Sequence, residues 1–133
     1  MPSQPINNES RADTMGCAEM MRSIARSRAN LELTYDDNSI RQLAGFVESE
    51  RLNIDQESRD QLVAAVGSFL GEAIIASYGG DWVQHEHGLG IEFEDGSIGF
   101  PFTKAEKHFA NGLEDNIYGL YRNIPRLRSP EIS

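Results

Sequence analysis

The stretch LGIEFEDGSIGFPF, residues 89–102, decides the fold class, because its apolar residues recur at every second position. This alternation is typical of a β-strand with one buried face. Asp95-Gly96 interrupts the pattern, and this dipeptide is favoured in the two-residue type I′ turn of a β-hairpin. With that turn, Phe93 lies opposite Ile98 and all the apolar side chains share one face. The sequence therefore predicts an antiparallel hairpin.

Residues 82–87, with the sequence WVQHEH, are expected to add a third strand before this hairpin. In the register that we favour, residues 86–88 form a three-residue loop with Gly88 in the left-handed conformation, which glycine adopts without steric cost. That register buries Val83 and directs Trp82 to the other face of the sheet. A two-residue loop would instead direct Trp82 inward, and the sequence leaves this alternative open.

Apolar residues spaced three and four positions apart predict three long helices around the sheet. These helices are expected at residues 40–52, 55–78 and 103–124. Asp55 and Thr103 are candidate N-caps for the second and the third. Gly67 and Gly71 lie four apart inside the second helix, where glycine lowers helix stability, so another element's backbone is expected to approach closely there.

These elements predict an α+β fold of two layers, in which a three-stranded antiparallel meander packs on about three helices. Residues 31–125 are expected to form this single domain. Residues 1–14 are rich in Pro, Ser, Asn and Gln and are predicted to be a flexible lead. Residues 15–30 are predicted to be a short helical arm, and residues 126–133 a mobile tail.

The 133-residue chain is acidic, with 21 Asp and Glu against 12 Lys and Arg and a net charge of -9. Residues 32–115 alone carry a charge of -12. Such a balance disfavours binding to nucleic acid or to an anionic membrane. It is typical of a solvated acidic surface that keeps a protein soluble, and the sharper interpretation is the electrostatic steering of a basic partner. The single cysteine, Cys17, excludes an intramolecular disulfide. No secretory signal or long apolar run is visible, so we expect a cytoplasmic protein.

The strongest local cluster of acid is expected on the polar side of the meander. We predict a partner-binding face there, with carboxylates surrounding one aromatic anchor, as in tight protein interfaces. Its residues are Trp82, Glu86, Glu92, Glu94 and Asp95.

His85 and His87 lie two apart on a predicted strand, so both imidazoles can point the same way and share a metal ion. A third ligand would have to come from Glu92, Glu94, Asp95 or His108. In the favoured register, however, His85 faces the helices and His87 falls in the loop. Surface or hydrogen-bonded histidines are therefore the preferred interpretation, and no bound metal or cofactor is expected.

Other candidates for chemistry are few. Glu72 lies within the apolar run FLGEAII, residues 69–75, and is expected to be partly buried with a structural partner such as Arg122. Phosphate-binding glycine loops, the serine-hydrolase motif and the zinc-protease motif are missing from the sequence. These observations indicate that the protein is not an enzyme.

Four segments together resemble small bacterial domains of unknown function, over roughly residues 35–122. The segments are FLGEAIIASYGGDW at 69–82, IEFEDG at 91–96, PFTKAEK at 101–107 and NGLED at 111–115. The resemblance implies an accessory bacterial protein without assigned chemistry. In size and acidity alone, the chain is also similar to immunity proteins, which bind and block a toxin.

The sequence thus favours a non-enzymatic acidic binding protein, most specifically an immunity-type inhibitor that neutralises a toxin by direct protein–protein binding. Its expected partner is a basic protein, and neither nucleic acid nor membrane is expected. The competing interpretations are a metal-dependent hydrolase using His85 and His87, and an accessory protein that forms a homodimer. Self-association would use the edge strand or the methionine-bearing N-terminal helix.

Overall fold

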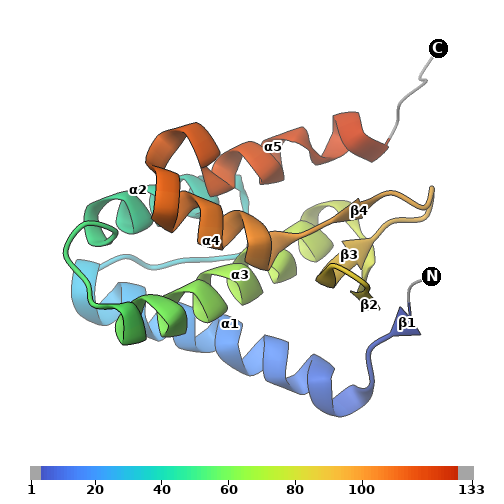
Figure 1. The fold of residues 1–133 in the computed structure, drawn as a ribbon, viewed down its shortest axis with the longest axis horizontal. Helices are drawn as coiled ribbons and strands as arrows, with labels where there is room; N and C mark the ends of the chain where they lie inside the picture. Colours follow the sequence, from blue (N-terminus) through green and yellow to red (C-terminus); the bar gives the residue numbers. More distant parts are fainter. Residues whose placement is uncertain (1–3, 129–133) are drawn as a thin grey trace.

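The computed structural model describes the backbone of residues 4–128 and the side chains of residues 4–125. Within that part, the fold is α+β, with five α-helices and one four-stranded antiparallel sheet (Figure 1). The strands are β1 (Gln4–Pro5), β2 (Asp81–His85), β3 (Gly88–Glu92) and β4 (Ile98–Gly99). The helices are α1 (Asn8–Ala29), α2 (Asp37–Glu50), α3 (Gln56–Tyr78), α4 (Pro101–Asn111), the 3₁₀ turn η1 (Gly112–Asp115) and α5 (Ile117–Arg128).

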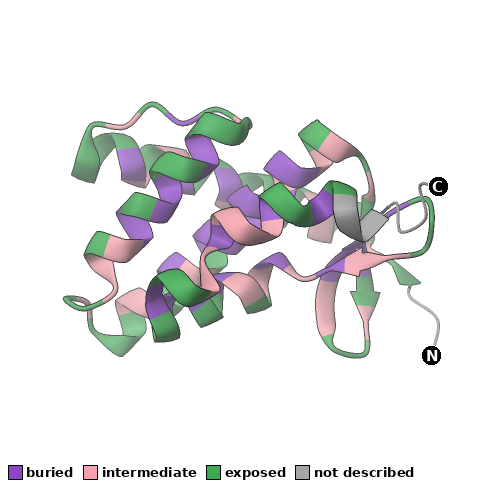
Figure 2. Ribbon diagram, turned by 90° about the horizontal axis from the view of Figure 1, so that it is seen from above, coloured by how far each residue is buried: buried purple, intermediate pink, exposed green. Residues whose placement is uncertain are grey.

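The predicted α+β class is confirmed, but the helices contribute more than expected. They make up about 68% of the structure, and the small sheet lies at one end of the helical body (Figure 1). The long helix α3 runs through the middle, with α1 on one side and α4 on the other. Buried residues of all these helices face the interior in Figure 2.

Helix α3 is central because its side chains are apolar over most of its circumference. Its N-cap is Asp55, as predicted, whose carboxylate accepts a hydrogen bond of 2.8 Å from the amide of Ser58. Its most apolar 18-residue window has a mean hydropathy of 1.4, enough by length and composition to cross a membrane. Since 56% of that window is buried in the protein, and core helices meet the same criterion, this is only a weak indication of a membrane span.

The N-terminal region is more ordered than predicted. Residues 4–14, expected to belong to a flexible lead, form β1 and the beginning of α1, whose N-cap is Asn7. The helix packs along α3 through residues that are mostly small. They are Thr14, Ala18, Met21 and Ala25. Small and polar residues give a weak hydrophobic signal, which explains why the start of the helix escaped prediction.

The predicted meander is present as β2, β3 and β4, but β1 pairs with β2 and makes the sheet four-stranded instead of three-stranded. Both registers of the meander also differ from the prediction. Between β2 and β3 the turn consists of Glu86 and His87, so Trp82 lies opposite Ile91 and faces the core. Neither register considered from the sequence has this pairing. The favoured prediction that Trp82 points away from the helices is therefore wrong.

The second turn is also longer than predicted. The amide of Phe93 donates to the carbonyl of Ser97, and residues 94–96 form a three-residue loop with Gly96 at a φ of 90°. Glu92 lies opposite Ile98 and Ile91 opposite Gly99. The apolar side chains of β3 and β4 are thus divided between two faces, because one extra loop residue shifts the register by one.

The predicted C-terminal helix is divided into α4, η1 and α5. Thr103, the predicted N-cap, lies inside α4, which begins at Pro101. Pro125 lies within α5 instead of ending it. The break follows Asn111, where Arg51 donates to the carbonyls of Phe109 and Ala110 at 3.2 and 3.1 Å. The last part of the predicted tail, residues 129–133, lies outside the described residues.

Candidate binding site

The predicted acidic residues are distributed over both ends of the β2–β3 hairpin. Glu86 lies in the turn between these strands, and the side chain is exposed. Glu92, Glu94 and Asp95 lie at the opposite end, where β3 leads into the 94–96 loop. A strand of five residues separates the two groups, about 16 Å at the usual rise. The structure therefore brings three of the four predicted acids together and leaves Glu86 apart.

Trp82, predicted to be the exposed aromatic anchor, is only 1% exposed. Its ring lies against the backbone of Gly71 in α3, where a Cβ atom would overlap with the indole. A second ring, Phe102, lies 5.5 Å away between centroids and covers Gly67 in the same manner. At Gly67 the Cα atom of Phe102 also lies 3.0 Å from the position of an added Cβ, so the predicted close approach of a backbone is confirmed there. At Gly71 the close neighbours are side chains instead, and Trp82 is part of the core.

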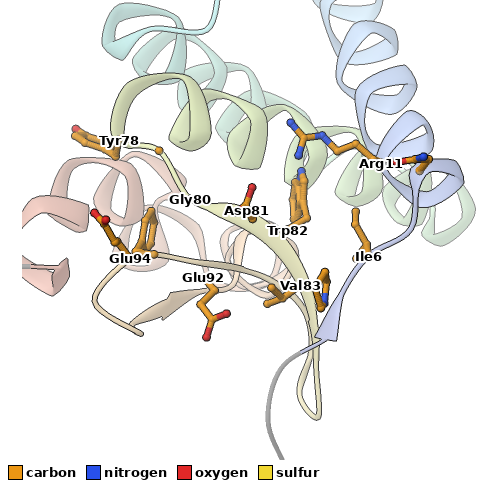
Figure 3. A pocket seen from close by; sticks show the side chains of 13 residues that line it. Ile6, Arg11, Tyr78, Gly80, Asp81, Trp82, Val83, Glu92 and Glu94 are labelled. Carbon is orange, nitrogen blue, oxygen red and sulfur yellow. The ribbon is translucent and has the colours of Figure 1, made fainter.

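A pocket of about 610 Å³ lies beside this acidic end of the sheet (Figure 3). It is bounded by the start of α1, the end of α3, the first residues of β2 and the loop after β3. Its lining residues are Pro5, Ile6, Asn8, Arg11, Tyr78, Gly79, Gly80, Asp81, Trp82, Val83, Glu92, Phe93 and Glu94. The volume is in the range of a site for a large side chain or a small ligand.

Three carboxylates, which we call the acidic rim, surround this pocket: Asp81, Glu92 and Glu94. Asp81 and Glu92 are direct partners across the β2–β3 ladder. Figure 3 shows the carboxylates of Asp81 and Glu92 directed to different sides, and Glu94 lines the same pocket as Tyr78. Sequence reasoning missed Asp81, because its position opposite Glu92 depends on a register that was predicted wrongly.

The remaining charge on the pocket wall belongs to Arg11, which projects from α1 (Figure 3). Its guanidinium lies 4.0 Å from the carboxylate of Glu72. Glu72 is 13% exposed and also accepts hydrogen bonds from Trp82 Nε1 at 2.8 Å and from Thr14 Oγ1 at 3.3 Å. The predicted burial of Glu72 is confirmed, but its arginine partner is Arg11 and not Arg122.

This network leaves the pocket with an excess of negative charge. Arg11 is balanced by the carboxylate beneath it, whereas no ion pair within residues 4–125 joins a member of the acidic rim to a cation. Tyr78 adds an aromatic wall, and burial raises the pKa of its hydroxyl above the ordinary value of 10, with Tyr121 contributing to the same shift. Tyr78 is therefore neutral at physiological pH.

His85 and His87 lie close together but do not form a metal site with further ligands. Their ring centroids are 5.1 Å apart, and the amide of His87 donates to His85 Nδ1 at 3.2 Å. His87 lies in the turn, 3.5 Å from a carboxylate oxygen of Glu86. Over the described part of the chain, no three histidine, cysteine or acidic residues are grouped so as to hold a metal ion.

His108 of α4, the other histidine considered as a ligand, is fully buried where this helix meets α2 and α5. Its Nδ1 accepts a hydrogen bond from the amide of Ile117 at 3.3 Å, and its Nε2 lies 3.0 Å from Glu48 Oε1. An acceptor at Nδ1 requires that Nε2 carry the proton donated to Glu48. His108 thus has a structural role at the junction of these helices.

Comparisons with known proteins add no assignment to this geometry. No protein-family model matches the chain, and no curated protein or solved structure matches it either.

Proposed function

We propose that this protein is a non-enzymatic acidic binding protein, most specifically an immunity-type inhibitor that binds a basic toxin in the cytoplasm. The observation that supports this proposal is the acidic rim of Asp81, Glu92 and Glu94 around a pocket of about 610 Å³. Protein partners recognise such a surface by inserting lysine or arginine, and a net charge of -9 accelerates their approach.

The pocket offers aromatic as well as electrostatic contacts to an inserted cation. The side chain of Tyr78 is partly exposed on its wall, and aromatic faces attract ammonium and guanidinium groups. Trp82 is too deeply buried to serve as the anchor, so this role passes to Tyr78. The contact surface is accordingly centred on the rim and extends to Asp95, while Glu86 lies at its far margin.

Solvent exposure of the rim favours binding over acid–base catalysis. Asp81 and Glu94 are exposed, whereas paired catalytic acids normally need burial to separate their pKa values. A basic partner, in contrast, gains from carboxylates that remain ionised and accessible.

The test uses the product of the neighbouring gene as the toxin. Co-expression with this protein should restore growth that the toxin alone arrests, and the two purified proteins should form a complex. Charge reversal by Glu92→Lys and Glu94→Lys should slow association by at least roughly tenfold at low salt and weaken its dependence on salt.

A matched variant, Asp60→Lys with Glu106→Lys, changes the net charge equally at exposed positions in α3 and α4, away from the pocket. It should rescue growth and associate at close to the unmodified rate. Equal behaviour of the two double variants would rule out the acidic rim as the contact, and a neighbouring product that neither arrests growth nor binds would contradict the immunity assignment.

A further inference from the structure

The opposite edge of the sheet carries a second surface with different chemistry. A groove of about 560 Å³ runs between β4, the first turns of α4, η1 and α5. Its lining residues are Ile98, Gly99, Phe100, Thr103, Lys104, Lys107, Leu113, Glu114, Asn116, Gly119, Leu120 and Asn123. We propose that this groove binds an extended, acidic segment of a partner protein, which adds a strand to β4. This inference is independent of the proposed function of the acidic rim.

The main-chain groups of Ile98 supply the first argument. β4 is the last strand of the sheet among the described residues, and it pairs with β3 alone. The hydrogen bond from Phe93 to Ser97 marks a bonded pair, so the next pair, Glu92 with Ile98, is of the non-bonded kind. The amide and carbonyl of Ile98 therefore point away from β3, where an added strand can form two hydrogen bonds.

The charge of the groove supplies the second argument. Lys104 and Lys107 are the only lysines of this acidic chain, and both line the groove. Lys104 lies 3.5 Å from Asp115, whereas Lys107 is exposed and has no ion pair among the described side chains. Glu114 is the single acidic residue in the lining, and Asp115 beside the groove already neutralises Lys104. Lys107 is therefore the cation that remains to bind an acidic side chain of the added segment.

The apolar lining supplies the third argument. Leu113 is 61% exposed on η1, and Leu120 of α5 lies further along the same groove. Side chains of an added strand alternate between its two faces. A segment with alternating acidic and apolar residues can therefore direct one set to the lysines and the other to these leucines.

The test titrates the full chain with a defined probe, an acetylated and amidated pentapeptide of alternating valine and glutamate. Amide NMR spectra should show saturable shifts centred on Ile98, Gly99 and Lys107. A peptide with glutamine for glutamate should bind roughly three- to fivefold more weakly, because it loses the ion pairs. A peptide methylated on its central amide should bind about two- to tenfold more weakly, because it loses a strand hydrogen bond.

Variants of the protein complete the design. Lys107→Gln should weaken binding of the glutamate peptide to the level of the glutamine peptide. Arg26→Gln removes an equal charge at an exposed site on α1, where Arg26 pairs with Glu32, and should bind within about twofold of the unmodified chain. Amide spectra confirm that each variant is folded.

Three results would overturn the proposal. The first is an absence of shifts at Ile98 and Gly99 with millimolar peptide. The second is equal binding of the glutamate, glutamine and methylated peptides. The third is concentration-dependent broadening of these amides without peptide, together with a dimer in sedimentation velocity, which would assign the edge to a second copy of this chain.

Discussion

The indole nitrogen of Trp82 donates a hydrogen bond of 2.8 Å to the carboxylate of Glu72. This bond joins β2 to α3, and Glu72 extends the connection to α1 through Thr14 and Arg11. The network lies directly behind the pocket, so the position of the pocket walls depends on it. It explains why a residue that resembles an interface anchor in the sequence is part of the core.

Removing the indole donor should destabilise the protein measurably. Trp82→Phe keeps an aromatic ring but leaves the mostly buried carboxylate of Glu72 without its shortest hydrogen bond. Urea unfolding followed by circular dichroism should show a loss of about 1.5–3 kcal/mol, the range for hydrogen bonds to charged groups. If the bond matters, Trp82→Phe and Glu72→Gln should be non-additive in the double variant. Strict additivity would show that the two residues act independently.

A methyl group at Gly71 should disturb the same junction. Gly71→Ala places a Cβ atom where the indole ring of Trp82 lies, and such overpacking typically costs about 1–3 kcal/mol. Gly45, exposed in the middle of α2, provides the matched control, because a Cβ atom added there would meet no other atom within 4 Å. Gly45→Ala should stabilise by about 0.5–1 kcal/mol through helix propensity. Thermal unfolding that moves in the same direction for both would contradict the packing argument.

Stability should decrease on mild acidification because of His108. Burial lowers the pKa of His108 below its ordinary value of 6.5, although Glu48 acts in the opposite direction. The unfolded chain therefore binds a proton more readily than the folded chain, and the unfolding free energy falls as the pH drops below about 6.5. Urea titrations between about pH 7.5 and 5.5 should show this slope, because native carboxylates stay ionised there.

The variant His108→Gln should lose this part of the pH dependence, whatever its absolute stability. The matched control is His87→Gln, because His87 is exposed in the β2–β3 turn and should keep the slope of the unmodified chain. An unchanged slope in His108→Gln would assign the effect to another group.

Loss of Arg51 should destabilise the junction between α2 and α4. Its guanidinium donates to the carbonyls of Phe109 and Ala110 at the end of α4, and it is 15% exposed. Arg51→Gln should cost about 1.5–3 kcal/mol in urea unfolding. Arg41→Gln, which removes an exposed and solvent-screened pair with Asp37, should cost clearly less than Arg51→Gln. Equal losses would show that Arg51 has no special capping role.

Elements with strong periodic patterns were predictable from the sequence. The stripe and the N-cap of α3 are local properties, and both agree with the structure. The start of α1 was not predictable in this way, because it is held by small residues against α3 and by β1 against β2. Such contacts join positions far apart in the chain and leave little local pattern.

The geometry of the candidate site depends on the strand registers, which the sequence alone does not determine. The dipeptide Asp95-Gly96 favours a two-residue turn, but the loop has three residues. This one-residue difference shifts the register of β4 against β3, so that the apolar side chains of the two strands lie on opposite faces of the sheet. The burial of Trp82 and the proximity of Asp81 to Glu92 both follow from the actual registers. Charge, in contrast, is a sum over composition, so the acidic character of this end of the sheet was predictable.

The buried position of Trp82 also provides an intrinsic fluorescence probe of this site. It is the sole tryptophan in the chain and a lining residue of the pocket, with its indole hydrogen-bonded to a carboxylate. Its fluorescence therefore reports on one junction without any introduced dye. A basic peptide entering the pocket would change the intensity or wavelength of this emission, so occupancy can be followed in real time on the unmodified chain.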